Sequence, residues 1–223
     1  MDKNKNYIEL EKLCRELGVD IFGVADIKEI KQDFLIADKI LAKVDRAICF
    51  GSRLTHGILE ELADTPDRLY YHHYKTVNAF LDQAALRLGN YIQDKGYLAL
   101  PIAASQIVDW DKLKGHLSHK RIGYLAGLGW IGRNNLLVHK TLGSQFRLVT
   151  VLTDMPLKTD KPIKDGCGPC RACIEVCPAK AIKPDPEDFN LQLCFAKLKE
   201  FQNAHLVDQY VCGLCLKCCK GRG

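Results

Sequence analysis

The chain has 223 residues, of which 47% are hydrophobic and 26% are charged. This is the composition of an ordinary globular protein with one core and a small appendage, or with two modest domains. The net charge of +5 is spread along the chain, which argues against a dedicated nucleic-acid surface. The N-terminus has no apolar export segment, and no apolar stretch reaches the ~20 residues of a membrane helix. We therefore expect a cytoplasmic protein without a membrane partner.

Residues 1–158 alternate between helical and strand patterns. Apolar residues at helical spacing predict an amphipathic helix near Leu10–Leu17 and a long one over 70–88. Short β-rich runs predict strands at 19–25, 47–51, 97–102 and 148–152. A polar, proline-containing linker begins at Met155. The sequence therefore predicts an α/β (α+β) domain over residues 1–158 and a second domain over residues 159–223.

Nine of the eleven cysteines lie between residues 167 and 219. In a chain without an export signal, this density indicates metal binding and not disulfides. The two outlying thiols differ from the rest, because Cys14 lies on the apolar stripe of a predicted helix and Cys49 in a predicted buried strand. We interpret both as inert core residues.

The first four clustered cysteines follow the C-x₂-C-x₂-C-x₃-C-P pattern of bacterial ferredoxins, which ends here at Cys177-Pro178. In this pattern the first three thiolates hold one 4Fe–4S cluster, and the fourth binds the other cluster. The later cysteines complete both sets, with Cys219 favoured over Cys218 for the last position. The predicted ligands are Cys167, Cys170, Cys173 and Cys219 for one cluster, and Cys177, Cys194, Cys212 and Cys215 for the other. Zinc is the alternative, but its sites use two C-x₂-C pairs and not a run of four.

A glycine motif, G-x-G-x-x-G, spans Gly127 to Gly132. A dinucleotide fingerprint needs a strand before this motif and a helix after it. Residues 118–125 instead have a helical pattern, so we reject that interpretation. A tight glycine loop can still bring the backbone close to a flat ligand. Trp130 then packs either on such a ligand or in the protein core.

The ordered combination of residues 126–138, Gly143-Ser144, residues 151–154 and the two cysteine sets resembles epoxyqueuosine reductase. It is more distantly similar to the corrinoid domain of reductive dehalogenases. The resemblance implies a nitroreductase-like domain that binds cobalamin, followed by a ferredoxin-like domain with two 4Fe–4S clusters. It also implies that electrons from a donor such as ferredoxin or flavodoxin pass through both clusters to the cobalt, while an acidic residue provides a proton.

The resemblance also suggests site residues in the first part of the chain. The nearest match to the family's catalytic acid is Asp109, although the insert at Gly115–Lys120 lengthens the path to the glycine loop. A general acid needs a raised pKa, and the alternative is that Asp109 caps a helix starting near Trp110. The predicted cofactor-binding residues are His116, His119, Gly127, Gly129, Trp130 and Gly132. For the two histidines, the alternative is a solvated turn capped by Ser118.

The sequence thus predicts a cobalamin-dependent iron–sulfur reductase. Members of the family continue into a helical-repeat domain that binds tRNA, whereas the sequence ends four residues after Cys219, so we expect a short form with weak tRNA affinity. The substrate is left open between a small molecule, a tRNA-borne base and a corrinoid protein. The alternatives are a corrinoid reactivator for a methyltransferase and a non-catalytic electron carrier.

Overall fold

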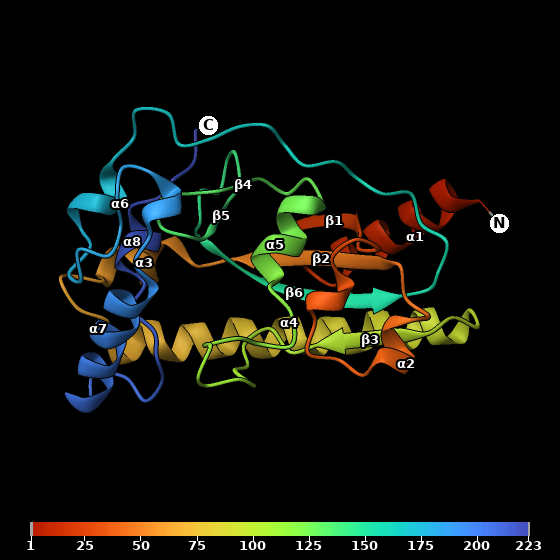
Figure 1. Ribbon diagram of the computed structural model, residues 1–223, viewed down its shortest axis with the longest axis horizontal. Helices are drawn as coiled ribbons and strands as arrows, with labels where there is room; N and C mark the ends of the chain where they lie inside the picture. Colours follow the sequence, from red (N-terminus) through yellow and green to blue (C-terminus); the bar gives the residue numbers. More distant parts are fainter. Residues whose placement is uncertain (1, 223) are drawn as a thin grey trace. The chain divides into compact units, whose positions relative to one another are not determined.

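The computed structural model describes residues 2–222 (Figure 1). The chain forms two compact units, each built from three separate segments. Unit 1 comprises residues 2–52, 78–128 and 147–163, and unit 2 comprises residues 53–77, 129–146 and 164–222. The sequence patterns did not anticipate that residues 53–77 and 129–146 group with the cysteine-rich segment. The sequence predicts a domain boundary after residue 158. In the structure the chain leaves unit 1 for the last time between residues 163 and 164.

Unit 1 is organised around a four-stranded sheet with the order β1-β2-β6-β3. Strand β1 pairs antiparallel with β2, with Val24 opposite Ile48, and β3 pairs antiparallel with β6. The strands are β1 (Ile21–Asp26), β2 (Arg46–Arg53), β3 (Ala99–Ile102) and β6 (Phe146–Thr153). All four predicted strands are confirmed, each within a few residues. Strand β6 is almost wholly buried, so this part of the sheet lies in the core.

Helices of unit 1 pack closely on the sheet. A Cβ atom on Gly23 of β1 would collide with the carbonyl of Ala126, which directly follows α5 (His119–Leu125). A Cβ atom on Gly89 of α4 (Arg68–Asp94) would lie 3.0 Å from Cγ of Pro101 in β3. Helix α1 (Lys3–Glu16) begins at Asp2, whose carboxylate accepts hydrogen bonds from two backbone amides. Two short helices, η1 (Lys31–Asp33) and α2 (Asp38–Leu41), precede β2.

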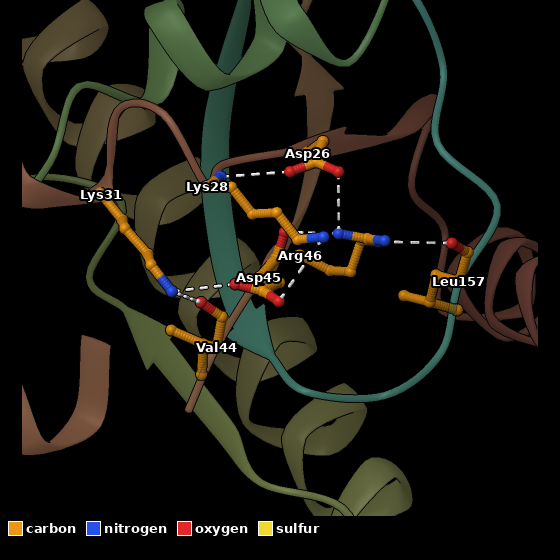
Figure 2. A network of polar contacts seen from close by, with 7 residues as sticks. All are labelled: Asp26, Lys28, Lys31, Val44, Asp45, Arg46 and Leu157. Carbon is orange, nitrogen blue, oxygen red and sulfur yellow. Dashed lines mark hydrogen bonds and ion pairs between the residues drawn. The ribbon is translucent and has the colours of Figure 1, made fainter. Parts of the chain in front are cut away.

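A polar network closes the end of the β1–β2 pair (Figure 2). Nη1 of Arg46 lies 3.0 Å from Oδ2 of Asp26, and its Nε donates to the carbonyl of Leu157 at 3.4 Å. Nζ of Lys31 donates to Oδ1 of Asp45 at 2.8 Å and lowers the pKa of that carboxyl. Exposed ion pairs of this kind contribute little stability each. Their main effect is to fix the segment after β6 against this end of the sheet.

Unit 2 contains short helices and one small hairpin. Its elements are α3 (His56–Glu61), the first turns of α4, β4 (Trp130–Ile131), β5 (Leu137–Val138), α6 (Ala172–Glu175), η2 (Pro186–Asp188), α7 (Leu191–Asn203) and α8 (Leu214–Lys217). Strands β4 and β5 pair antiparallel. The ring of Tyr70 lies against Gly213, where any Cβ atom would meet it.

The structure confirms a mixed α/β class with small antiparallel sheets. Cys14 and Cys49 are fully buried in unit 1, and burial raises the pKa of each thiol to about 12. The prediction that both are core residues is therefore confirmed. None of the helices between residues 2 and 222 is long and apolar enough to cross a membrane.

Candidate functional site

The nine clustered cysteines all lie in unit 2, on loops and short helical turns. Cys167 and Cys170 precede α6, Cys173 lies within it, and Cys177 follows Val176, the residue that caps its C-terminal end. Cys194 lies in the first turns of α7, and the last four cysteines surround α8. Gly213 adopts φ +87° at the start of α8, which allows the chain to turn between Cys212 and Cys215.

One group of thiols forms around Cys173. Burial raises the pKa of this thiol to about 11, and the neighbouring thiols that raise it further are Cys219, Cys167 and Cys170. Mutual influence of this kind requires spatial proximity. The first three cysteines of the ferredoxin-like run therefore lie near a cysteine from the far end of the chain.

A second group forms around Cys215. Burial raises the pKa of Cys215 well above its ordinary value, with further contributions from Cys212, Cys194 and Cys177 and from Cys218. Burial also raises the pKa of Cys212 to about 11, with Cys194 and Cys177 as its thiol neighbours. Cys177 thus leaves the other members of its own run and joins the later cysteines. The crossed ligand assignment made from the cysteine spacing stays a prediction.

Cys218 lies beside the first group as well. Its Sγ donates to the carbonyl of Cys215 at 3.3 Å, and its pKa is raised to about 12 by burial and then by Cys173, Cys219 and Cys170. Both Cys218 and Cys219 are therefore close to the first three cysteines. The choice of Cys219 as the last ligand stays a prediction.

Within residues 2–222, no three His, Cys, Asp or Glu side chains converge as ligands of a single metal ion would.

The segment between the glycine motif and β6 supports both cysteine groups. The guanidinium of Arg133 donates to the carbonyls of Gly168 and Cys170, both at 2.9 Å. Nδ2 of the buried Asn134 donates to Oγ of Ser144 at 3.1 Å and to the carbonyl of Cys215 at 3.4 Å. The sequence reasoning missed both residues. A charged and an amide side chain directly after a tight glycine turn were the available signal.

The side chain of Trp130 carries an unsatisfied donor. The residue is only 3% exposed, and its indole N–H is the one buried side-chain polar atom among residues 2–222 that lacks a hydrogen-bond partner. The guanidinium of Arg222 lies 5.8 Å from the centre of the ring. A buried donor without a partner is costly, and iron–sulfur clusters accept hydrogen bonds at sulfur. This orphaned donor in the cysteine-rich unit fits a missing acceptor such as a cluster.

The glycine motif lies after helix α5 and runs into the β4–β5 hairpin, so it does not open a strand–helix unit. Gly127 adopts φ +69°, and a Cβ atom there would lie 2.8 Å from the carbonyl of Lys161 within unit 1. Gly129 adopts φ +155°, and its Cβ atom would collide with the carbonyl of Val138 within unit 2. A Cβ atom on Gly132 would contact Val138 and lie 3.5 Å from Sγ of Cys167. The close approaches at these glycines are therefore to the protein itself.

The two predicted histidines lie beside a cavity of about 180 Å³ in unit 1. Nε2 of His119 lies 2.9 Å from the carbonyl of Ala103, and Nδ1 lies 2.8 Å from Oγ1 of Thr150. Because a carbonyl only accepts, Nε2 carries the proton and Nδ1 accepts from the hydroxyl. Loss of hydration lowers the pKa of the ring to about 4. His119 is thus a neutral, fully partnered residue, while His116 lines the same cavity.

Asp109 begins a tight turn and not a helix. Its backbone pairs with Lys114 in both directions, at 3.0 and 2.9 Å, and its Oδ1 accepts from the amide of Lys112 at 2.9 Å. Leu113 adopts φ +53° to close this turn. The alternative interpretation as a helix cap is therefore wrong, because the five residues after Asp109 form a turn. One carboxylate oxygen is engaged in that turn.

A further cavity of about 720 Å³ lies in unit 2 between α3, α6 and α8. Its lining includes Cys177, Pro178 and Cys218, together with Glu60 and Lys217. Nζ of Lys217 donates to the carbonyls of Glu60 and Leu62. This cavity lies next to both cysteine groups and brings solvent close to them.

Comparison with known proteins places this arrangement in a wider group. No family model matches the chain. The epoxyqueuosine reductase of Cyclobacterium marinum is 29% identical over 204 residues, which cover 79% of this chain and 63% of that protein. The enzyme of the same name from Escherichia coli K12 is 41% identical over 73 residues, which cover 33% and 19%. The chain is thus similar in sequence to epoxyqueuosine reductases. The matched segments span between 15% and 63% of the length of the curated relatives.

Solved structures of the same group share the fold. Epoxyqueuosine reductase from Streptococcus thermophilus superposes with a TM-score of 0.65 at 19% identity, over 97% of this chain and 66% of that one. The catabolic reductive dehalogenase NpRdhA superposes with a TM-score of 0.70 at 21% identity, over 82% of this chain and 26% of that one. The relationship to epoxyqueuosine reductases therefore extends from sequence segments to the fold of the described chain.

Proposed function

We propose that the chain is an iron–sulfur oxidoreductase that uses two 4Fe–4S clusters and cobalamin in a reductive reaction. The single observation that carries this proposal is the sorting of the cysteines into two groups. Cys177 lies with Cys194, Cys212 and Cys215, while its sequence neighbours lie with Cys219. This crossed arrangement is typical of two-cluster ferredoxins. It supports a ferredoxin-like module within unit 2.

The clusters would provide one-electron transfer, and the chain's own residues would hold them and set their surroundings. Cys173 is buried and Cys212 and Cys215 are partly buried, so solvent would have limited access to these three thiolates. The side-chain amide of Asn134 donates to the backbone carbonyl of Cys215 and so fixes the backbone at this proposed ligand. The unpartnered N–H of Trp130 is available as a donor to sulfur.

The cobalamin part of the proposal has different support. A structure similar to this chain, at 21% identity, is described as that of a reductive dehalogenase with a mechanism for B12-dependent dehalogenation. Unit 1 would be the nitroreductase-like domain that the family resemblance implies. The residues chosen from the sequence fit a corrinoid poorly, however, because protein carbonyls fill the open sides of Gly127 and Gly129. Neither glycine is therefore assigned a role in binding cobalamin.

The substrate we propose to test first is epoxyqueuosine within an RNA stem loop. The curated relatives are named epoxyqueuosine reductase, and one similar structure contains an epoxyqueuosine-modified tRNA stem loop. In this reaction Asp109 would donate the proton, with ferredoxin or flavodoxin as the electron donor. Asp109 retains one carboxylate oxygen that its own turn does not use.

The test is anaerobic reconstitution of the full chain with iron and sulfide, followed by iron and sulfide analysis. We expect about eight of each per chain. An iron content near four, or zinc in place of iron, would overturn the two-cluster proposal. Cobalamin is then added, and free and protein-bound corrinoid are separated by gel filtration.

Activity is measured with an epoxyqueuosine stem loop and a low-potential reductant. Reduction of the stem loop supports the reductase proposal. Two full clusters without corrinoid binding and without turnover would favour the electron carrier. Corrinoid binding without turnover, together with reduction of a partner's corrinoid, would favour the reactivator.

A further inference from the structure

Arg133 connects the first cysteine loop to the segment that follows the ferredoxin-like run. Its Nη2 donates to the carbonyl of Gly168 and its Nη1 to that of Cys170, each at 2.9 Å, and its Nε donates to the carbonyl of Pro184. All of these residues belong to unit 2. The planar guanidinium thus uses three donors on three backbone carbonyls, a fork that a lysine cannot reproduce.

The loop of residues 167–171, which Arg133 contacts, contains no helix or strand. Gly168 adopts φ +51°, and the hydrogen bond from the amide of Cys170 to the carbonyl of Cys167, at 3.1 Å, closes one turn. The carbonyls of Gly168 and Cys170 both accept from Arg133. Arg133 therefore orders the stretch that carries the first two thiols of the cluster pattern.

The charge of Arg133 has no counter-ion in the described residues. Among residues 2–222, no carboxylate forms an ion pair or hydrogen bond with it, whereas Arg222 pairs with Asp165 at 3.2 Å and Arg68 with Asp208 at 2.7 Å. A guanidinium held by neutral carbonyls keeps its net positive charge. That charge lies beside the loop of Cys167 and Cys170.

We propose that Arg133 is a positioning residue for the first cluster and also raises the reduction potential of that cluster. This inference rests on the two-cluster function proposed above. Reduction adds one negative charge to a cluster that is already anionic, and a fixed nearby cation favours the more negative state. Cluster potentials depend on net charge, hydrogen bonding and exposure. The charge of Arg133 changes the net charge around the cluster. Its three hydrogen bonds fix the backbone that carries Cys167 and Cys170.

Two variants separate these contributions in the reconstituted full chain. Arg133→Gln removes both the charge and the fork, whereas Arg133→Lys keeps the charge and loses the fork. Arg171→Gln is the matched control, because Arg171 is exposed, adjoins Cys170 in sequence, and its side chain forms no hydrogen bond or ion pair among residues 2–222. Midpoint potentials are measured by redox titration followed by electron paramagnetic resonance. The rate of iron release to a chelator is measured separately and needs no turnover.

Arg133→Gln is expected to lower the equilibrium constant for reduction of one cluster about tenfold, which is about 59 mV for a one-electron couple. Arg133→Lys should keep most of that potential. Both variants should release iron several times faster than the unaltered chain, while Arg171→Gln should match it. Failure of the variants to load one cluster while the other remains also supports the positioning role.

The proposal is overturned if both Arg133 variants show the same potentials and iron-release rates as Arg171→Gln. That result is distinct from failure of the proposed function. In the latter case the unaltered chain itself would not bind about eight irons.

Discussion

Gly143 lies directly against the carbonyl of Cys219. A Cβ atom on Gly143, which adopts φ +59°, would collide with that carbonyl, and the amide of the next residue, Ser144, donates to the same oxygen at 3.2 Å. Three residues after Cys219, the amide of Arg222 donates to the carbonyl of Lys140 at 2.7 Å. The backbone that carries the predicted last ligand therefore runs along the turn at residues 139–144.

Gly143→Ala should displace Cys219 and release one of the two clusters. The added methyl group cannot fit against the carbonyl, and the left-handed backbone conformation is unfavourable for alanine. We expect the iron content to fall from about eight to about four per chain. Gly166→Ala is the control, because no atom lies within 4 Å of its Cβ position. Equal iron contents in the two variants would contradict the expectation.

Cys219→Ser and Cys218→Ser should differ in iron content. Cys219 is among the thiols that raise the pKa of Cys173, and it follows the x₃ step after Cys215. Cys218 instead donates to a backbone carbonyl. We expect Cys219→Ser to lose or convert one cluster and Cys218→Ser to keep nearly all iron, as measured by iron analysis and electron paramagnetic resonance. The opposite result would identify Cys218 as the ligand.

His119 should make the stability of the fold depend on pH below neutrality. The pKa of the ring is lowered to about 4 in the fold, against about 6.5 in the unfolded chain. The unfolded chain therefore takes up the proton first as the pH falls. The stabilisation is complete above pH 6.5 and is lost toward pH 4, with about 2 kcal/mol gone by pH 5.

Urea unfolding at pH 7 and pH 5, followed by circular dichroism, measures this difference. His119→Gln is the informative variant, because an amide can donate to the carbonyl of Ala103 and accept from Thr150 without titrating. It should lose about 2 kcal/mol less between the two pH values than the unaltered chain does. An unchanged pH dependence in this variant would show that other groups are responsible.

Asp109→Asn should separate the proton-donating role of Asp109 from its structural role. The asparagine oxygen can still accept from the amide of Lys112, so the turn is expected to persist. Loss of a general acid slows a proton-consuming step by roughly 10²–10⁴-fold. Turnover of the epoxyqueuosine stem loop measures this rate, and iron content serves as the control. Turnover equal to that of the unaltered chain would leave Asp109 as a turn residue.

Much of the architecture could be predicted from the sequence, because it depends on local pattern. The stripe that includes Leu10 and Cys14 predicts α1, and β-rich runs predict the four strands of the main sheet. The cysteine spacing likewise predicts which thiols group together. These signals are read over a few neighbouring residues, where periodicity and spacing are informative.

The remaining features depend on contacts between distant segments, which no local pattern encodes. In the sequence, Gly127 and Gly129 resemble a ligand-binding loop. In the structure, the carbonyl of Lys161 lies against Gly127 and that of Val138 against Gly129, where a side chain would not fit. Asp109 has the chemistry of a helix cap, but backbone pairing with Lys114 produces a turn. The position of Arg133 after a glycine turn is visible in the sequence, but its three carbonyl partners are not, because every residue has a backbone carbonyl.

Unit 2 depends on residues that are far from the cysteines in the chain. Gly213 packs against Tyr70, Lys217 reaches Glu60, and the carbonyls beside the first cysteines are held by Arg133. Such distant pairings require the closure of long loops, which slows folding. During synthesis the early segments must wait, without their partners, until the last cysteines have left the ribosome. A fragment of residues 159–223 alone would lack these supports, so we expect it to be a poor autonomous ferredoxin and an unsuitable unit for grafting onto another protein.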